Sequence, residues 1–149
     1  MKKWKKIFEQ GPVLTHSEAE MVALGRRMAD ELEAGDALGL VGDLGAGKTH
    51  LIQGLLEGLG CSDPAASPTF SLVHEHEGGR LRAAHFDFYR MRSPEEAFGI
   101  GWDEYADGDA VLLVEWADRF DGALMPPRTL WLVLRHEGPS ERSVMLAGD

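Results

Sequence analysis

The first regular pattern of apolar residues along the chain predicts a helix. Apolar and small side chains recur at helical spacing from Met21 through Ala34. Thr15 and Ser17 each stand three positions before a glutamate, which is the spacing of a capping box at a helix start. Gly35 follows as the expected C-terminal cap. We therefore expect a helix that starts near Thr15 or Ser17 and ends before Gly35.

A short apolar run comes next and is typical of a buried strand. Residues 37–41, with the sequence ALGLV, lead directly into the glycine-rich segment 42–49, GDLGAGKT. Leucines and an isoleucine then recur at helical spacing as far as Leu59, and Gly60 follows as a cap. Strand, glycine-rich loop and helix in this order are the context that a phosphate-binding loop, or P-loop, requires.

The rest of the chain predicts a hairpin, a short helix and further strands. Two strand-like runs meet at the Gly78-Gly79 turn, and Ser93 with the proline after it marks a helix start. The expected strands are 70–76, 81–88, 110–114, 129–134 and 142–146. Without a linker or repeat, residues 1–149 predict a single α/β domain of the P-loop NTPase fold. We expect a mostly parallel central sheet flanked by helices, with a β-hairpin and antiparallel edge strands.

Composition narrows the class of protein. A chain of 149 residues, 44% hydrophobic and 27% charged, has the make-up of one folded domain. Its apolar runs are too short to cross a bilayer, so we expect no membrane association. The basic segment 1–6 has no apolar stretch after it, which argues against a signal peptide and predicts a flexible tail. The single cysteine, Cys61, suits a reducing compartment. These features predict a cytoplasmic protein.

The charge balance bears on possible partners. Asp and Glu number 25 against 15 Lys and Arg, which gives a net charge of −10. Affinity for nucleic acids depends largely on cationic contacts to phosphates. We therefore expect no strong direct binding to DNA or RNA.

Each part of segment 42–49 has a chemical task. Glycines permit backbone angles at which amides point inward at phosphate oxygens, and the following helix turns its N-terminal amides toward the same anion. Lys48 is expected to neutralise the β- and γ-phosphates and the Thr49 hydroxyl to bind Mg²⁺. The residues expected to contact nucleotide here are Gly42, Asp43, Leu44, Gly45, Ala46, Gly47, Lys48, Thr49 and His50.

Nucleotide hydrolysis needs a further carboxylate near the metal. Glu115 ends the apolar run 110–114, and Asp87 lies near the end of the preceding strand-like run. Ligands gather at the carboxyl ends of strands in α/β sheets, so both are candidate magnesium and catalytic residues. The alternative is an exposed carboxylate at a strand end. Thr69, in the proline-containing loop 67–70, is a candidate for sensing the γ-phosphate, or else part of a simple connection.

Four segments in this order resemble those of one family. They are GDLGAGKT at 42–49, SPTF at 67–70, HFDFYR at 85–90 and VEW at 114–116. On these segments the chain resembles TsaE (formerly YjeE), the P-loop ATPase of the bacterial pathway that makes threonylcarbamoyladenosine (t6A) in tRNA. The resemblance spans nearly the whole chain. It departs at His50, where a second threonine is usual.

The resemblance implies roles for individual residues. Glu115 matches a magnesium ligand, and Asp87 matches an acidic residue needed for hydrolysis, through the attacking water or the metal shell. Thr69 matches a switch-like loop. Trp116 matches a tryptophan close to the nucleotide, and Thr15 matches a residue near the adenine.

The resemblance also implies an activity and partners. It implies Mg²⁺-dependent binding and slow hydrolysis of ATP, which acts on a complex of TsaD and TsaB homologues and resets it between turnovers. Two alternatives stay open. A small-molecule kinase would use the same loop but pass the phosphate to an acceptor, and a nucleotide-gated binding module would need no useful hydrolysis. No base-reading motif in the sequence separates ATP from GTP.

Overall fold

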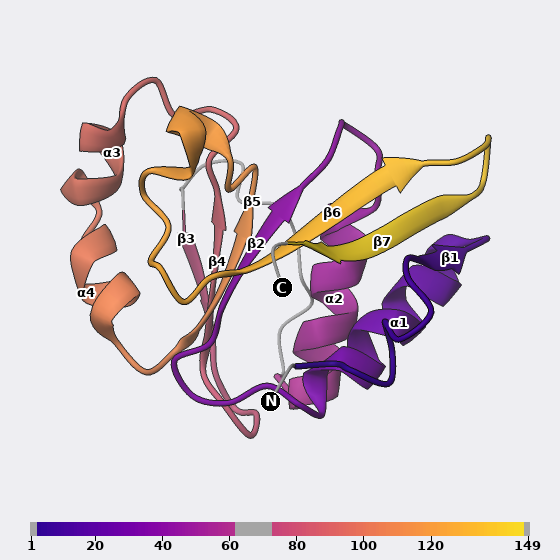
Figure 1. Cartoon of the computed structure of the whole chain (residues 1–149). Helices are drawn as coiled ribbons and strands as arrows, with labels where there is room; N and C mark the ends of the chain where they lie inside the picture. Colours follow the sequence, from indigo (N-terminus) through magenta and orange to yellow (C-terminus); the bar gives the residue numbers. More distant parts are fainter. Residues whose placement is uncertain (1–2, 62–72, 148–149) are drawn as a thin grey trace.

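The computed structural model describes residues 3–61 and 73–147. Its elements are, in order, β1 (Val13–Thr15), α1 (Glu18–Ala29), β2 (Ala37–Val41), α2 (Lys48–Leu59), β3 (Val73–His76), β4 (Ala83–Asp87), α3 (Pro94–Gly99), α4 (Trp102–Asp107), β5 (Val111–Glu115), the 3-10 turn η1 (Arg119–Gly122), β6 (Leu130–His136) and β7 (Arg142–Ala147). A central sheet lies between two layers of helices, with α1 and α2 on one face and α3 and α4 on the other (Figure 1). None of the helices in the described ranges is long and apolar enough to span a membrane.

The sheet has seven strands in the order β1-β7-β6-β2-β5-β4-β3. The four strands in its middle, β6, β2, β5 and β4, run parallel to one another. At one edge β7 and β1 are antiparallel, and at the other edge β3 forms an antiparallel hairpin with β4. The predicted fold class is therefore confirmed, including the hairpin and the antiparallel edges.

Alternation along the central strands decides which side chains face α1 and α2. In β5, Val111 and Leu113 pack in the core beneath these two helices, and the residues between them pack in the core beneath α3 and α4. Successive side chains of a strand point to opposite faces, so Glu115 faces the same side as Leu113. The same alternation in β4 places His85 and Asp87 on that side. Three polar side chains of two neighbouring strands thus face α2, the helix that follows the glycine-rich loop.

Helix α1 begins later than Thr15. Ser17 is its N-cap, and its hydroxyl accepts a hydrogen bond of 3.1 Å from the N–H of Glu20. The spacing of Ser17 and Glu20 predicted this cap. Thr15 instead belongs to β1, where it pairs with Arg142 at the edge of the sheet. Of the two predicted helix starts, Ser17 is therefore confirmed and Thr15 is wrong.

Helix α1 also ends earlier than predicted, at Ala29 rather than Ala34. Beyond it, the carboxylate of Asp36 accepts a hydrogen bond of 2.8 Å from the N–H of Glu33. Gly35 has a φ of 85°, which glycine adopts without steric cost. These residues form the turn that leads into β2, so Gly35 acts in this turn and not as the cap of α1.

The predicted flexible tail is wrong for residues 3 and 4. Trp4 has no exposed surface, and its indole N–H donates a hydrogen bond of 2.8 Å to the carbonyl of Met28. The ammonium of Lys3 donates to the carbonyl of Glu31 at 2.7 Å and pairs with Glu33 at 2.8 Å. The large apolar ring of Trp4 therefore anchors this segment against the end of α1. The basic residues of segment 1–6 did not predict this packing of Trp4.

Helices α1 and α2 approach each other so closely that glycine is required at their contact. A Cβ atom at Gly54 would lie 2.0 Å from the backbone oxygen of Val22, and one at Gly25 would lie 2.4 Å from that of Leu51. Both distances are far inside van der Waals contact with backbone atoms, which cannot move without shifting a helix. This close packing sets the position of α2, and therefore of the glycine-rich loop at its start.

We expect Gly54→Ala to destabilise the protein by about 3 kcal/mol, the upper range for overpacking a core. The loss should appear although alanine favours a helix over glycine by about 1 kcal/mol. The measurement is the free energy of unfolding in urea. Gly99→Ala is the matched control, because a Cβ at Gly99 in α3 meets nothing within 4 Å. Equal stability of both variants would show that the helices separate without cost.

Candidate nucleotide-binding site

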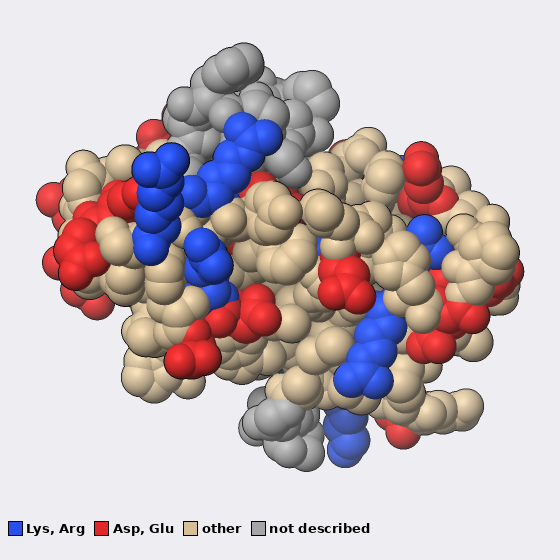
Figure 2. Space-filling view, turned by 90° about the horizontal axis from the view of Figure 1, so that it is seen from above, with Lys and Arg blue, Asp and Glu red and all other residues tan. Residues whose placement is uncertain are grey.

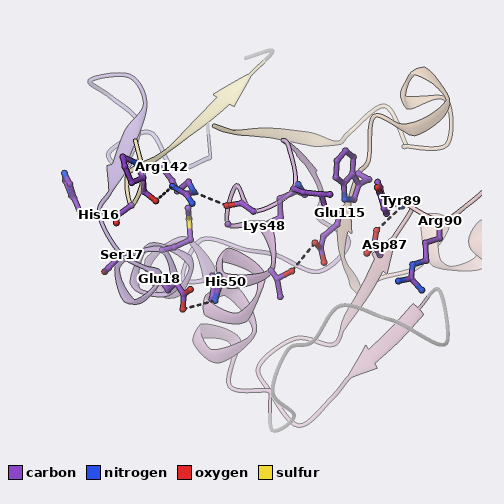
Figure 3. Close-up of a pocket in the computed structure, with 18 residues that line it drawn as sticks. His16, Ser17, Glu18, Lys48, His50, Asp87, Tyr89, Arg90, Glu115 and Arg142 are labelled. Carbon is purple, nitrogen blue, oxygen red and sulfur yellow. Dashed lines mark hydrogen bonds and ion pairs between the residues drawn. The ribbon is translucent and has the colours of Figure 1, made fainter. Parts of the chain in front are cut away.

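A cavity of about 770 Å³ opens at the end of the sheet where the strands β2, β4 and β5 finish. Figure 2 looks down on this end of the molecule, where acidic and basic side chains are interspersed. The cavity is lined by His16, Ser17, Glu18, Met21, Leu44, Gly45, Gly47, Lys48, Thr49, His50, Asp87, Tyr89, Arg90, Glu115, Trp116, Pro139, Ser140 and Arg142. Figure 3 shows Lys48, Glu115, Asp87, Tyr89 and Arg90 toward one end and His16, Ser17, Glu18, His50 and Arg142 toward the other. The cavity is large enough for a nucleotide-sized ligand.

The loop between β2 and α2 has the backbone shape that its glycines predict. Gly45 and Gly47 have φ angles of 78° and 103°, a region that favours glycine. At Gly47, the N-cap of α2, a Cβ would lie 2.7 Å from the methyl carbon of Met21. At Gly42 it would lie 2.5 Å from the backbone oxygen of Leu134. Backbone contact therefore disfavours a larger residue at Gly42, and the positive φ disfavours one at Gly45 and Gly47. The first amides of a helix have no partner within the helix, so those of α2 can bind an anion at this end.

The hairpin of β6 and β7 holds the loop from outside. The guanidinium Nε of Arg142 donates a hydrogen bond of 3.0 Å to the carbonyl of Gly45. His136 donates from Nε2 to the carbonyl of Leu44 at 3.1 Å. Leu44 itself is 66% exposed. These two contacts turn the carbonyls of Leu44 and Gly45 toward the hairpin.

Lys48 is buried at the base of the loop. Its ammonium donates to the carbonyls of Gly42 and Asp43 at 2.5 and 2.9 Å and lies 4.3 Å from the ring centroid of Trp116. Burial lowers the pKa of Lys48, and the negative charges of Glu115 and Asp87 oppose that shift. A cation therefore lies between the loop and the two carboxylates that end β4 and β5.

Thr49 and Glu115 bring two oxygen donors together. The Thr49 hydroxyl donates to Oε1 of Glu115 at 3.2 Å, from the start of α2 to the end of β5. Asp87 is the register partner of Glu115 in the parallel pair of β4 and β5. The pKa of Asp87 is raised, mainly by burial; the N–H of Tyr89, 2.9 Å from Oδ1, opposes this shift and the charge of Glu115 adds to it.

These oxygens fit the preferences of magnesium. Mg²⁺ is usually held by one or two carboxylates together with phosphate oxygens and water, rather than by a cage of protein ligands. In the part of the chain that the structure describes, no group of three or more His, Cys, Asp and Glu side chains is placed to hold a metal ion. The donor set of Thr49 and Glu115, with Asp87 nearby, is suited to a cation that arrives with a phosphate ligand.

An aromatic pair closes one side of the cavity. Trp116 and Tyr89 have ring centroids 4.8 Å apart with an interplanar angle of 37°. Trp116 directly follows β5 and has a φ of 56°, an unusual angle for a bulky residue. This turn of the backbone brings the indole face over the Lys48 ammonium instead of continuing the strand. Strained backbone of this kind is common at functional sites.

Comparison with known proteins shows the family to which the chain belongs. The family model described as "Threonylcarbamoyl adenosine biosynthesis protein TsaE" matches residues 15–144. The chain belongs to the TsaE family. The protein named "tRNA threonylcarbamoyladenosine biosynthesis protein TsaE" of Bacillus subtilis is 40% identical over 130 residues, which cover 87% of this chain and 80% of that protein.

Two further comparisons agree with membership of the TsaE family. The protein of the same name from Haemophilus influenzae is 38% identical over 112 residues, covering 72% of this chain and 71% of that protein. The crystal structure of Bacillus subtilis YdiB matches with a TM-score of 0.77 and 35% identity, and the match covers 91% of this chain and 82% of that one. The fold of this chain is therefore the fold of a solved relative.

The structure brings most of the predicted site residues of this TsaE chain to one cavity. Those that line it are Leu44, Gly45, Gly47, Lys48, Thr49, His50, Asp87, Glu115 and Trp116. Among the described residues, the structure leaves four predicted ones off the lining: Thr15, Gly42, Asp43 and Ala46. Thr15 is 3% exposed and lies in β1, beside lining residues. Thr69 lies outside the described residues.

Several lining residues were not among the predicted site residues. Ser140 and Arg142 arrive from the β6–β7 hairpin, and Tyr89 and Arg90 from the segment after β4. Tyr89 and Arg90 do belong to the HFDFYR segment, so a search of the residues flanking Asp87 would have included them. Arg142 becomes recognisable only once β7 is paired with β6.

Proposed function

We propose that this chain binds ATP with magnesium in the cavity at the end of β2, β4 and β5, and hydrolyses the γ-phosphate slowly. One observation carries the proposal: a glycine-rich loop, a buried ammonium, a hydroxyl and two carboxylates converge on a single cavity. Lys48 and Thr49 come from the loop and α2, and Asp87 and Glu115 from the strands beside them. This combination of groups suits phosphoryl transfer.

Each group that lines the cavity has a role that follows from its position. Backbone amides at the start of α2 bind phosphate oxygens, and the Lys48 ammonium exchanges its contacts with the Gly42 and Asp43 carbonyls for contacts with the β- and γ-phosphates. A magnesium ion held by Thr49 and Glu115 would neutralise the charge that develops on the phosphate oxygens. Asp87 orients the attacking water, because its carboxylate lies beside Glu115 on the neighbouring strand.

Hydrolysis by the isolated chain is slow in this proposal. Asp87 is tied to the N–H of Tyr89, and its raised pKa reflects a buried setting that disfavours the charged form. Arg90 is an exposed cationic side chain that lines the cavity at the same end as Asp87. A partner protein that repositions Asp87 and Arg90 would accelerate ATP hydrolysis.

The biological role follows from the family. The relatives are named for the biosynthesis of threonylcarbamoyladenosine in tRNA, and we propose that ATP hydrolysis by this chain acts on a complex of TsaD and TsaB homologues in that biosynthesis. The chain itself has a net charge of −10. A helper protein with this charge works through its protein partners, without strong binding to tRNA of its own.

The test measures phosphate release from ATP by the purified chain, alone and with its TsaD and TsaB homologues, and t6A in tRNA of cells that lack the gene. We expect slow release alone, faster release with the partners, and loss of t6A in the deletion. Formation of ADP and a phosphorylated acceptor, without release of free phosphate, when a small-molecule acceptor is added would favour a kinase. Undiminished t6A in cells with a variant that binds but does not hydrolyse ATP would favour a binding module. Competition by ADP and GDP tests the preference for adenine.

A further inference from the structure

The carboxylate of Glu115 is engaged at both oxygens. Oε1 accepts the hydrogen bond of 3.2 Å from the Thr49 hydroxyl, and Oε2 lies 2.6 Å from Nε2 of His85. His85 has no exposed surface, and Glu115 is 3% exposed. The second contact is short and fully removed from solvent, where a hydrogen bond to a charged group is strong.

We propose that His85 is a positioning residue for the magnesium site, because it fixes the orientation of the Glu115 carboxylate. This inference rests on the proposed function. Glu115 lines the cavity, whereas His85 is not among the described residues that line it. His85 therefore reaches the proposed magnesium site through its contact with Glu115. A carboxylate held on one side by a buried donor keeps its other oxygen directed at Thr49, where the cation binds.

The hydrogen-bond chemistry of the imidazole supports one arrangement. A carboxylate can only accept, so Nε2 of His85 must carry the proton that is shared with Glu115. Nδ1 is buried and has no partner in the described part of the chain. His85 thus serves as the donor in this contact, and Oε2 of Glu115 accepts from it.

The backbone makes this contact rigid. His85 and Asp87 lie on the same face of β4, and β4 pairs in register with β5, with His85 opposite Leu113 and Asp87 opposite Glu115. Donor and acceptor therefore come from central strands of one sheet, which hold a side chain more precisely than loops do. Groups that orient metal ligands in this way typically contribute 10–100-fold to metal affinity.

The test compares His85→Leu with His85→Gln by calorimetry of ADP binding over a range of Mg²⁺ concentrations. Leucine removes the donor, whereas the glutamine amide can place an N–H near the Nε2 position. We expect the Mg²⁺ concentration for half-maximal binding enhancement to rise about 10-fold or more in His85→Leu and about threefold at most in His85→Gln. ADP binding in EDTA should be alike in both variants and in the unaltered chain, which excludes general damage.

A double-mutant cycle with Glu115→Gln separates positioning from a structural role. If His85 acts through Glu115, adding His85→Leu to Glu115→Gln raises the half-maximal Mg²⁺ concentration no further. A further rise of similar size, or an unchanged value in His85→Leu alone, would overturn the inference while leaving the proposed function intact. If ADP binding by the unaltered chain does not depend on Mg²⁺, both the inference about His85 and the proposed function are wrong. His85→Asn, whose amide ends short of the Nε2 position, repeats the test if the leucine variant does not fold.

Discussion

Replacing Lys48 with methionine is expected to weaken ADP and ATP binding at least 100-fold. The ammonium of Lys48 is the cation at the base of the loop, and methionine keeps most of its apolar stem while removing the charge. A hydrogen bond to a charged group contributes about 1.5–3 kcal/mol, and Lys48 would make such bonds to two phosphates. A loss of about 3 kcal/mol already corresponds to more than 100-fold in the dissociation constant. Calorimetry with Mg²⁺ and each nucleotide measures the change.

The control for Lys48→Met is Lys5→Met, because Lys5 is exposed and lies outside the residues that line the cavity. It removes the same charge from the protein as a whole and should leave both dissociation constants within about twofold, as expected for a distant surface charge. Inorganic tripolyphosphate provides a second probe. It should compete with ATP on the unaltered chain and on Lys5→Met. Nucleotide binding by Lys48→Met within threefold of the unaltered chain would refute the phosphate-binding role of the loop.

The sequence was sufficient to predict the structure of the glycine-rich half of the cavity because that half is local. The segment from β2 through the loop to α2 is continuous, and its strand bounds (37–41) and the Gly60 cap agree with the structure. The identities of Lys48 and Thr49 follow from spacing alone. Glu115 and Asp87 were also identifiable, because both stand where an apolar strand ends and parallel strands end at one edge of the sheet.

The other half of the site depends on contacts between segments far apart in the chain. Strand β1 has only three residues and exists because it pairs with β7, so no local pattern predicted it. The same pairing brings Arg142 to the loop carbonyl of Gly45. The contact of His85 with Glu115 required the register of β4 against β5. Once that register is known, alternation along β4 alone places His85 and Asp87 on the face of Glu115.

Trp4 and helix α4 illustrate two further causes of error. In the lysine-rich segment 1–6, the tryptophan decides whether the segment packs on the protein, because the free energy gained by burying a large ring exceeds the cost of removing the segment from solvent. Helix α4 spans only Trp102–Asp107 and starts after Gly101, which has a φ of 83°. The ring of Trp102 packs against the ring of Phe86 in β4, with 4.9 Å between the ring centroids. Tertiary packing stabilises such a short helix, and intrinsic propensity does not.

Replacing Asp87 with asparagine is expected to reduce ATP hydrolysis at least about 100-fold while nucleotide binding stays within about threefold. A residue that positions or deprotonates water typically contributes two to four orders of magnitude, and asparagine cannot accept a proton. The Oδ1 atom that accepts from the N–H of Tyr89 is retained, so the local backbone should hold. Phosphate release in single turnovers and calorimetry with ADP measure the two effects. Undiminished hydrolysis would show that Asp87 does not act on the water.

The same change is expected to stabilise the protein in the absence of nucleotide and magnesium. Burial, with a further contribution from Glu115, raises the pKa of Asp87 above its ordinary value of 3.8. Asp87 therefore costs the folded state free energy when it is ionised, and this cost is largest above its folded-state pKa. Asparagine removes it, so Asp87→Asn should raise Tm by a few degrees at pH 8. The gain should shrink as the pH falls through the raised pKa and vanish below the ordinary value.

Asp121→Asn is the matched control, since Asp121 is exposed and has a φ of 58° that asparagine also tolerates. Its Tm should differ little from that of the unaltered chain at either pH. Hydrolysis by the unaltered chain should lose activity on the acid side at a higher pH than an ordinary aspartate would require, because Asp87 must be ionised to act. A lower Tm in Asp87→Asn at pH 8 would show that the Asp87 charge stabilises the fold. A higher Tm together with lost hydrolysis would show that the half-buried charge of Asp87 destabilises the fold and is needed for turnover.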